Sequence, residues 1–248
     1  MALAQAGVKR VVVADPHDDL LARRLQRICD QLSLELNCLE TPMFLNTAAD
    51  NRRYRNGKRR WFMADYYKHQ RRRLDILMEN GDPAGGKWSF DEANRKKVPK
   101  ALLGSIPDLG TAAHDALDRD ARAHILQRYP HAPGSLDALI YPTSHEEARG
   151  WLARFVAQRF EHFGAYEDAI VAGENHLWHS VLTPMLNTGL LTPSEVLTAA
   201  LDSNRAAAIP LNSLEGFVRQ VIGWREFMRA TYEDLGTTMR NGNHWQHH

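Results

Sequence analysis

The sequence predicts an α/β portion with an incomplete parallel sheet, followed by an all-α region, so that the chain is mostly helical overall. Two observations predict this division. Residues 8–16 (VKRVVVADP) form a β-branched run closed by Asp and Pro, which is typical of a buried parallel strand. From Ser144 onward, apolar residues recur at helical spacing behind repeated helix-start signals.

The first strand is followed by a predicted helix and a second strand. Residues 34–39 (LELNCL) are typical of that second strand. Two parallel strands with one crossover helix leave both sheet edges unpaired and one face bare, so we expect this unit to need further strands. Residues 138–141 are the only later candidate. The helix is indicated by apolar residues that share one face: Leu21, Leu25, Ile28, Cys29 and Leu32.

A basic, aromatic-rich stretch comes next. Ten basic residues and one acidic residue lie between residues 51 and 73, and the pattern from Lys58 to Met78 predicts a helix. A solvated charged face is one interpretation, and a surface that follows a phosphate backbone is the other. Gly and Pro then interrupt the pattern over residues 81–100. The polar stretch that continues to Pro142 predicts an interdomain connection with short helices.

Composition sets ordinary limits. The chain has 248 residues, 44% of them hydrophobic, and a formal net charge of +1, which indicates a globular protein without a strong overall field. No apolar stretch reaches the length of a membrane span, and the N-terminus lacks the apolar core of a signal peptide. Cys29 and Cys38 do not form a CxxC pair, so we expect reduced thiols and a cytoplasmic protein.

Three helix starts are predicted in the second half by Ser144 with Glu147, by Thr192 with Glu195, and by Asn212 with Glu215. In the last helix, Gly223 lies at an interior position where it costs about 1 kcal/mol relative to Ala, which indicates close packing. Helical spacing places four apolar residues of this helix on one face: Phe217, Val221, Trp224 and Met228.

Hydroxyl side chains surround Pro184 and Gly189 in the segment 179–192. Hydroxyls and free backbone amides at helix starts donate hydrogen bonds to anionic oxygens, as a pyrophosphate requires. On spacing alone, a pair of ordinary capped helices is the favoured interpretation. The hydroxyl residues are Ser180, Thr183, Thr188 and Thr192.

Three motifs carry a family resemblance: GGKWSFDEANRKKVP (residues 85–99), FGAYEDAI (163–170) and LNSLEGFVRQVIGWREF (211–227). Together they resemble deoxyribodipyrimidine photolyase-related proteins, the bacterial iron–sulfur branch of the photolyase and cryptochrome family, and the resemblance extends over nearly the whole chain. It implies the later part of a Rossmann-like antenna domain over residues 1–80. An interdomain connector would occupy residues 81–143, and the first part of a helical FAD-binding domain would occupy residues 144–248.

The resemblance also implies site residues. In photolyases a tyrosine precedes a segment that wraps the phosphates of FAD, and a WREF helix follows. Trp224 matches the tryptophan of the WRE motif, which lines the cavity for a flipped-out lesion, so we expect it to bind substrate; a core aromatic is the alternative. Arg225 is either a cofactor ligand or half of a surface pair with Glu226. The implied cofactor-binding residues are Tyr166, His179, Ser180, Val181, Leu182, Thr183, Asn187 and Arg225.

The function that the resemblance implies is light-dependent repair of damaged DNA, in particular (6-4) photoproducts, by electron transfer from reduced FAD. A lumazine-type antenna pigment and a [4Fe-4S] cluster are implied for the intact protein. We expect the chain to be truncated, because the family's flavin ring pocket, catalytic histidines and cluster cysteines would lie beyond His248. No catalytic or metal-binding residue is therefore predicted here. We expect a monomer when intact and self-association of this chain.

Two alternatives belong to other classes. A cryptochrome-like blue-light photoreceptor would bind the same flavin and signal instead of repairing DNA. A non-catalytic nucleic-acid-binding or structural protein would keep the fold without the flavin.

Overall fold

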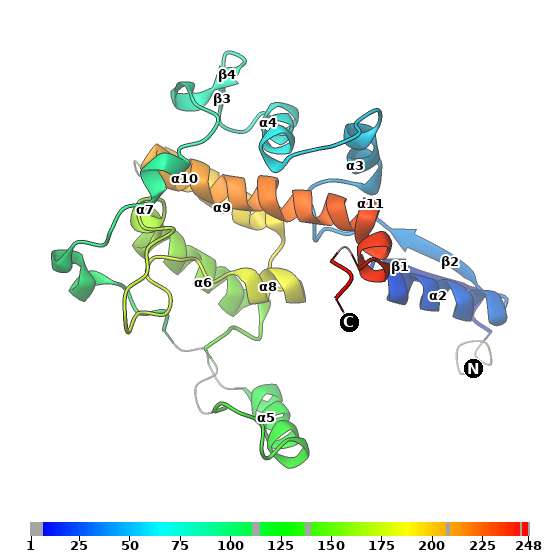
Figure 1. Ribbon diagram of the computed structural model, residues 1–248. Helices are drawn as coiled ribbons and strands as arrows, with labels where there is room; N and C mark the ends of the chain where they lie inside the picture. Colours follow the sequence, from blue (N-terminus) through cyan, green and yellow to red (C-terminus); the bar gives the residue numbers. More distant parts are fainter. Residues whose placement is uncertain (1–6, 111–114, 137–139, 207–208, 244, 248) are drawn as a thin grey trace. The chain divides into compact units, whose positions relative to one another are not determined.

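The computed structural model describes residues 7–110, 115–136, 140–206, 209–243 and 245–247, and it is mostly helical (Figure 1). The chain forms two compact units. The terminal unit comprises residues 1–69 and 222–248, and the central unit comprises residues 70–221. None of the described helices is both long and apolar enough to cross a bilayer. The domain boundaries at residues 80 and 143 stay a prediction for the intact protein.

The terminal unit begins with the predicted strand–helix–strand arrangement. Strands β1 (Arg10–Ala14) and β2 (Glu35–Leu39) pair in parallel, and α2 (Asp19–Gln31) connects them (Figure 1). Asp18 caps α2 by accepting the Leu21 N–H at 2.7 Å. The predicted α/β portion is thus confirmed, with two described strands that leave Val12 and Leu39 more than half exposed.

The basic stretch divides between two helices and a loop. Helix α3 (Ala48–Arg55) starts at a capping box between Thr47 and Asp50, which the sequence analysis missed, and α4 (Met63–Leu74) follows. The single helix predicted from Lys58 to Met78 is therefore wrong at both ends. Gly57 follows α3 at a φ of 74°, a conformation that ordinary side chains resist.

An aromatic cluster joins these helices to α11 (Glu226–Asn241) within the terminal unit. Tyr54 of α3 meets Tyr66 of α4 edge to face at 5.0 Å, and Tyr66 lies 5.6 Å from Phe227 of α11. Rings at these separations are favourable beyond their buried area. The core of this unit is thus aromatic and lies between α3, α4 and α11.

The first part of the central unit has little regular structure. A short antiparallel hairpin pairs β3 (Met78–Glu79) with β4 (Asp82–Pro83). Half of the candidate strand at residues 138–141 lies outside the described residues, and the described half, residues 140 and 141, is not in a strand. This stretch contains short helices, as predicted: η1 (Ala84–Gly86), η2 (Asp91–Asn94), η3 (Lys100–Ser105) and α5 (Ala116–Arg128).

The rest of the central unit is helical. Two predicted helix starts are confirmed, since Ser144 accepts the Glu147 N–H at 3.2 Å and Thr192 forms a complete capping box with Glu195. The third is wrong, because Asn212 and Glu215 lie inside a helix that begins at Leu211. The elements are α6 (His145–Gln158), α7 (Phe160–Phe163), α8 (Thr183–Thr188), α9 (Pro193–Ala206) and α10 (Leu211–Val218). A π-helical segment (Arg219–Arg225) follows α10 and continues past residue 221 into the terminal unit.

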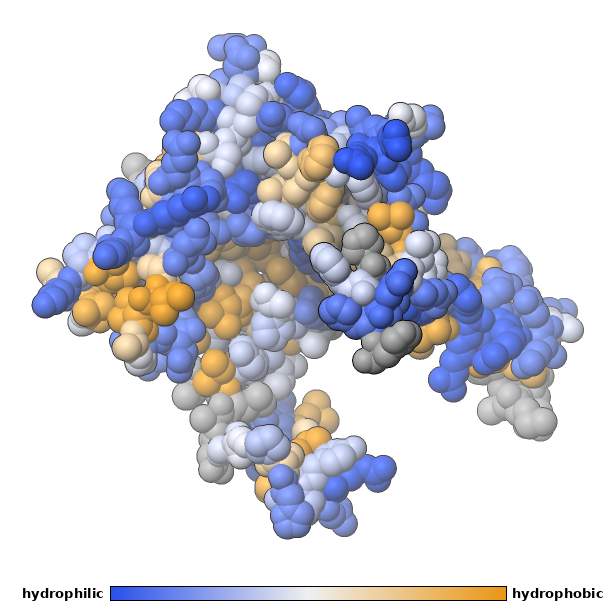
Figure 2. Space-filling view, viewed as in Figure 1, coloured by the Kyte–Doolittle hydropathy of each residue, from blue (hydrophilic) through white to orange (hydrophobic). Residues whose placement is uncertain are grey.

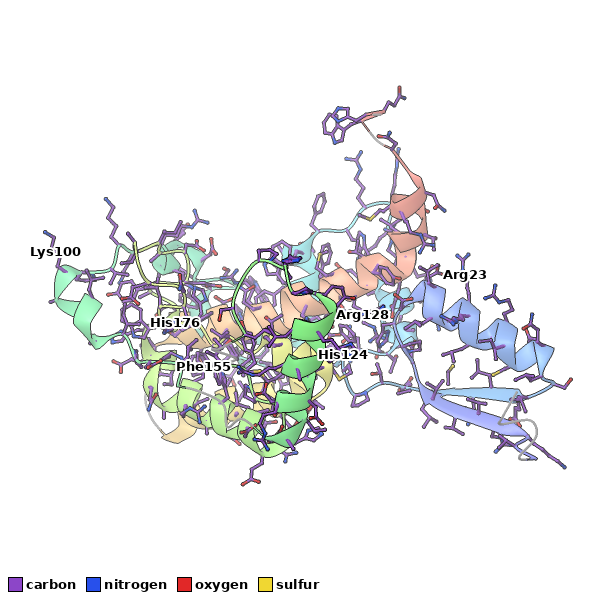
Figure 3. All side chains as sticks on the ribbon, turned by 90° about the horizontal axis from the view of Figure 1, so that it is seen from below. Arg23, Lys100, His124, Arg128, Phe155 and His176 are labelled. Atoms are coloured by element: carbon purple, nitrogen blue, oxygen red, sulfur yellow. The ribbon has the colours of Figure 1, made fainter. Side chains whose placement is uncertain are left out.

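The core of the central unit lies where α10 contacts α7 and α9. Phe155 of α6, labelled in Figure 3, lies 5.0 Å from Phe217 of α10 and 5.1 Å from Phe160. Gly164 permits this packing, since a Cβ at its position would lie 2.6 Å from the backbone of Ser213. A small residue is therefore required where α7 meets α10.

The single apolar face predicted for the last helix is wrong, because a π-helical segment interrupts that helix. Phe217 and Val221 are 5% exposed, whereas Trp224 is 42% and Met228 is 57% exposed. A π-turn holds more residues than an α-turn, so residues on either side of it no longer follow one 3.6-residue stripe. The predicted close packing at Gly223 is confirmed, because a Cβ there would lie 3.2 Å from the Tyr67 ring.

Candidate functional site

The predicted phosphate-binding segment lies in the central unit, in the loop that leads into α8. Leu182 immediately precedes α8 and is 2% exposed, and Gly189 ends the helix in the left-handed conformation at a φ of 80°. The carbonyl of Ser180 accepts the indole N–H of the buried Trp151 at 2.8 Å. Val181 adopts a φ of 52°, which is uncommon for a β-branched residue. The backbone of this loop is therefore anchored from α6.

The loop presents hydrogen-bond donors that the protein does not use. Among the described residues, no acceptor is found for the amides of Ser180, Val181 and Leu182. Thr183 and Asn187 of α8 are exposed, and neither side chain has a protein partner in the described part of the chain. Backbone amides and hydroxyls gathered in this way suit anionic oxygens. By contrast, the Thr188 hydroxyl donates to the Pro184 carbonyl at 2.8 Å.

Aromatic rings pack against Trp178 and His179 at the start of this loop. The Tyr166 ring lies 5.0 Å from the Trp178 ring, and His162 lies 5.2 Å from Trp178 edge to face. The His179 ring meets Phe163 edge to face at 5.9 Å. Tyr166 is 9% exposed, so its ring contributes to the packing of the central unit. The contact of Tyr166 with a cofactor stays a prediction.

Apolar residues of η3 and of residues 165–171 pack around Tyr166 and Trp178. Figure 2 shows hydrophobic residues gathered at the surface over these elements, at the left of the view. Ile170 is 96% exposed. The packing that holds Tyr166 therefore lies close to the surface of the central unit.

A polar network gives the WSFDEANRK motif a structural role that the sequence analysis missed. The buried Asn94 donates to Glu167 at 3.0 Å and accepts the Asn212 side-chain N–H at 3.1 Å. Glu167 also accepts Gln220 Nε2 at 2.6 Å. Because buried polar groups need partners, these bonds fix η2 against α10 and the segment that contains Tyr166.

Ion pairs extend this network. The Arg219 guanidinium lies 3.2 Å from Asp91 and 3.3 Å from Glu215, and Glu215 accepts the Phe90 N–H at 2.8 Å. Arg219 is 7% and Glu215 0% exposed. Removing one partner of a buried charge pair costs several kcal/mol of stability, because the other charge is left uncompensated. Each of these charged residues is therefore needed for stability. Glu215, predicted to start a helix, instead holds the motif that contains Phe90.

Trp224 and Arg225 lie in the terminal unit. The Arg225 guanidinium stacks 4.2 Å over the Phe44 ring and donates to the Met43 carbonyl. Burial lowers the pKa of Arg225 from its usual value, and Arg229 acts in the same direction. Trp224 lies 6.3 Å from Phe227 and is not a core residue. The cofactor and substrate contacts of these two residues stay predictions.

Glu226 of the same WRE motif is a buried anchor. Its carboxylate accepts the N–H groups of Leu45 and Asn46 at 2.9 and 3.1 Å. Burial raises the pKa of Glu226 above its usual value, against the opposing effect of these hydrogen bonds and of two arginines. Arg229 donates to the Asn46 carbonyl and lies 2.8 Å from Glu233. The motif thus binds the loop of residues 43–46 within the terminal unit.

A cavity of about 870 Å³ also lies in the terminal unit, lined by the loop after β1, by α3 and by α11. Two of its acidic lining residues are paired: Asp19 with Arg240 at 3.0 Å, and Asp234 with Arg55 at 2.8 Å. Its lining also carries charges of both signs, such as Asp18 and Arg52. This mixture of charges does not indicate one class of ligand.

The chain is similar to known proteins over most of its length. Residues 1–141 match the family described as deoxyribodipyrimidine photo-lyase-related protein, which is more than half of the chain. The chain is 28% identical to the (6-4) photolyase of Agrobacterium fabrum over 237 residues, which cover 96% of this chain and 46% of that protein.

Two proteins of Acanthamoeba polyphaga mimivirus match shorter parts. Uncharacterized protein R852 is 32% identical over 95 residues, 37% of this chain and 48% of that protein. Uncharacterized protein R853 is 44% identical over 75 residues, 30% of this chain and 57% of that protein. The chain thus spans about half the length of the curated relatives it matches.

Proposed function

Because this chain belongs to the deoxyribodipyrimidine photo-lyase-related family, we propose that the intact protein repairs pyrimidine lesions in DNA, in particular (6-4) photoproducts, in a light-dependent reaction. The observation that carries the proposal is the similarity to a (6-4) photolyase over 96% of this chain. When bound, reduced FAD would supply the electron for the repair.

The residues of the central unit fit the phosphate end of FAD. The amides of Ser180 and Val181 and the side chains of Thr183 and Asn187 are donors without protein acceptors in the described part of the chain. A pyrophosphate needs several hydrogen-bond donors. Neutral donors suffice, because a hydrogen bond to a charged acceptor is stronger than one between two neutral groups. His179 and Leu182 are neighbours of these donors in the chain, and Tyr166 packs against Trp178, which precedes them. We assign all of them to the phosphate-binding segment.

Two residues of the terminal unit are proposed from the family motif alone, Trp224 for the substrate and Arg225 for the cofactor. Trp224 exposes 42% of its surface, and its ring is available to stack on a base that has left the duplex. Arg225 is held by Met43 and Phe44, so its guanidinium has a fixed position from which to approach the cofactor. Fixed side chains lose less entropy on binding than mobile ones.

FAD titration of the 248-residue chain tests the phosphate-binding segment. Flavin fluorescence should report weak binding that ADP competes away, since the assigned residues contact phosphates and none is assigned to the flavin ring. Replacing Thr183 by Val together with Asn187 by Leu should weaken binding about tenfold or more, the effect of losing hydrogen bonds to a charged group.

Thr188→Val is the matched control, because that hydroxyl is already bonded within α8. It should leave FAD affinity unchanged. An unaltered affinity in the Thr183 and Asn187 double variant would overturn the assignment. Repair by the intact protein is tested by illuminating an oligonucleotide that carries a (6-4) photoproduct. Loss of the photoproduct supports repair, whereas bound flavin without repair would favour a photoreceptor.

A further inference from the structure

The loop between α3 and α4 carries the exposed cations of the basic stretch. Lys58, Arg59 and Arg60 are all exposed, and no acidic partner is found for Arg59 or Arg60 among the described residues. Two cations of α3 are engaged instead: Arg53 lies 3.1 Å from Asp50 and Arg55 lies 2.8 Å from Asp234. Arg59 and Arg60 are therefore two consecutive arginines without an acidic partner in the described part of the chain.

The same loop exposes an aromatic ring. Phe62 is 63% exposed, although its neighbour Trp61 turns inward and lies 5.3 Å from Phe227. The Phe62 carbonyl accepts the Tyr66 N–H at 3.0 Å, so Phe62 is held at the start of α4. A single exposed aromatic residue is common on protein surfaces. An exposed aromatic residue two positions after a pair of arginines without acidic partners is more specific.

The Phe62 segment adjoins the Trp224 segment. Met63 Sδ lies 3.6 Å from the Cβ position of Gly223, and Trp61 contacts Phe227, whose ring is 6.3 Å from Trp224. The two neighbours of Phe62 therefore contact Gly223 and Phe227, which lie before and after Trp224 in the chain. Figure 2 shows hydrophobic residues at the start of α4 directly beside strongly hydrophilic ones. The exposed rings of Phe62 and Trp224 and the basic loop thus belong to two segments of the terminal unit that contact each other.

We propose that Arg59, Arg60 and Phe62 form a second contact with DNA, adjoining Trp224, in which the cations bind phosphates and Phe62 stacks on an unpaired base. Basic residues interleaved with aromatic ones are the means by which proteins bind single strands without sequence preference. The identification of the strand as DNA rests on the proposed function. The contact itself rests on charge and exposure in the terminal unit.

The test measures binding of the 248-residue chain to fluorescein-labelled oligothymidylate by anisotropy across a salt titration. For single strands, the logarithm of affinity falls with the logarithm of salt by about 0.7 per phosphate neutralised. Replacing Arg59 and Arg60 by Ala should therefore flatten the slope by about 1.4. The matched control replaces Arg24 and Arg27, two exposed arginines on α2, and should leave the slope unchanged.

Phe62→Ala should act differently from the arginine changes. It should weaken binding about fivefold or more at every salt concentration, the effect of losing one stacked base, with an unchanged slope. Phe62→Trp should restore the affinity. Leu20→Ala, at a position 61% exposed on α2, is the control for loss of an exposed apolar side chain and should have no effect.

Equal slopes in the two double-arginine variants would overturn the proposal, as would unchanged affinity in Phe62→Ala. Binding of polyglutamate with the same salt slope would identify an acidic protein partner and would overturn it too. None of these measurements uses flavin or light. A failed repair assay of the intact protein together with the expected oligothymidylate results would therefore reject the proposed function and retain this contact as one with a single strand.

Discussion

The side-chain amide of Asn94 donates a hydrogen bond of 3.0 Å to the carboxylate of Glu167. The two residues belong to two of the motifs that carry the family resemblance, WSFDEANRK and FGAYEDAI. Gly216 of the third motif lies against the same pair, because a Cβ at its position would be 2.7 Å from Asn94 Nδ2. The three motifs therefore meet at one buried polar contact in the central unit.

Replacing Asn94 by Ala should lower the free energy of unfolding by about 2 kcal/mol or more, because buried Glu167 and Asn212 groups would lose their partner. Urea denaturation followed by circular dichroism measures the change. Asn187→Ala, at an exposed position without a protein partner in the described chain, is the control and should change stability by less than about 0.5 kcal/mol. Equal stability of the two variants would contradict the role assigned to Asn94.

Replacing Gly164 by Ala should lower the free energy of unfolding by about 1–3 kcal/mol, because the new methyl group would overlap the Ser213 backbone. Thermal denaturation would show a lower Tm. Gly150→Ala, in the middle of α6 with only an arginine tip 3.7 Å away, should instead raise stability by up to about 1 kcal/mol through helix propensity. A neutral Gly164→Ala would show that α7 and α10 pack less closely than described.

Replacing Thr192 by Ala should lower the free energy of unfolding by about 1 kcal/mol at neutral pH through loss of the α9 cap. The Thr192 N–H lowers the pKa of Glu195 below its usual 4.5, with the Thr192 hydroxyl and Arg149 acting in the same direction. A lowered folded-state pKa stabilises the protein above pH 4.5, and this contribution is lost as pH falls through the folded pKa.

The difference between the wild type and Thr192→Ala should therefore shrink in acid, as measured by urea denaturation at a series of pH values. Thr188→Ala removes a hydroxyl bonded within α8 and should show no such pH dependence. A constant difference across the series would mean that the Glu195 carboxylate does not contribute to the cap.

Replacing Arg71 by Ala should lower the free energy of unfolding by about 3 kcal/mol, because its buried guanidinium donates to four carbonyls, those of Ile76, Leu77, Lys87 and Trp88. Arg72→Ala is the comparison. That guanidinium is exposed and stacks 4.4 Å over the Trp88 ring, so its loss should cost less than about 1 kcal/mol. Chemical denaturation of both variants decides between a structural Arg71 and a solvated one.

Local patterns determined the elements that the sequence predicts well. The β-branched run at residues 8–16 and the apolar stripe after it suffice for a strand and a helix, because their residues have strong local preferences. The cap signals at Ser144 and Thr192 were correct for the same reason, since a capping box needs only four consecutive residues. The family resemblance also rests on sequence alone, and the match over residues 1–141 confirms it.

Only the tertiary structure decided the positions where long-range contacts compete with local signals. Glu215 has the spacing of a helix start, yet it binds the Phe90 N–H and Arg219, because a buried carboxylate gains more from those partners than from a cap. Trp224 has the spacing of a core residue, yet the π-helical segment turns it outward. A pattern of period 3.6 cannot register one extra residue in a turn. It also cannot show that Trp61, far away in the chain, contacts Phe227.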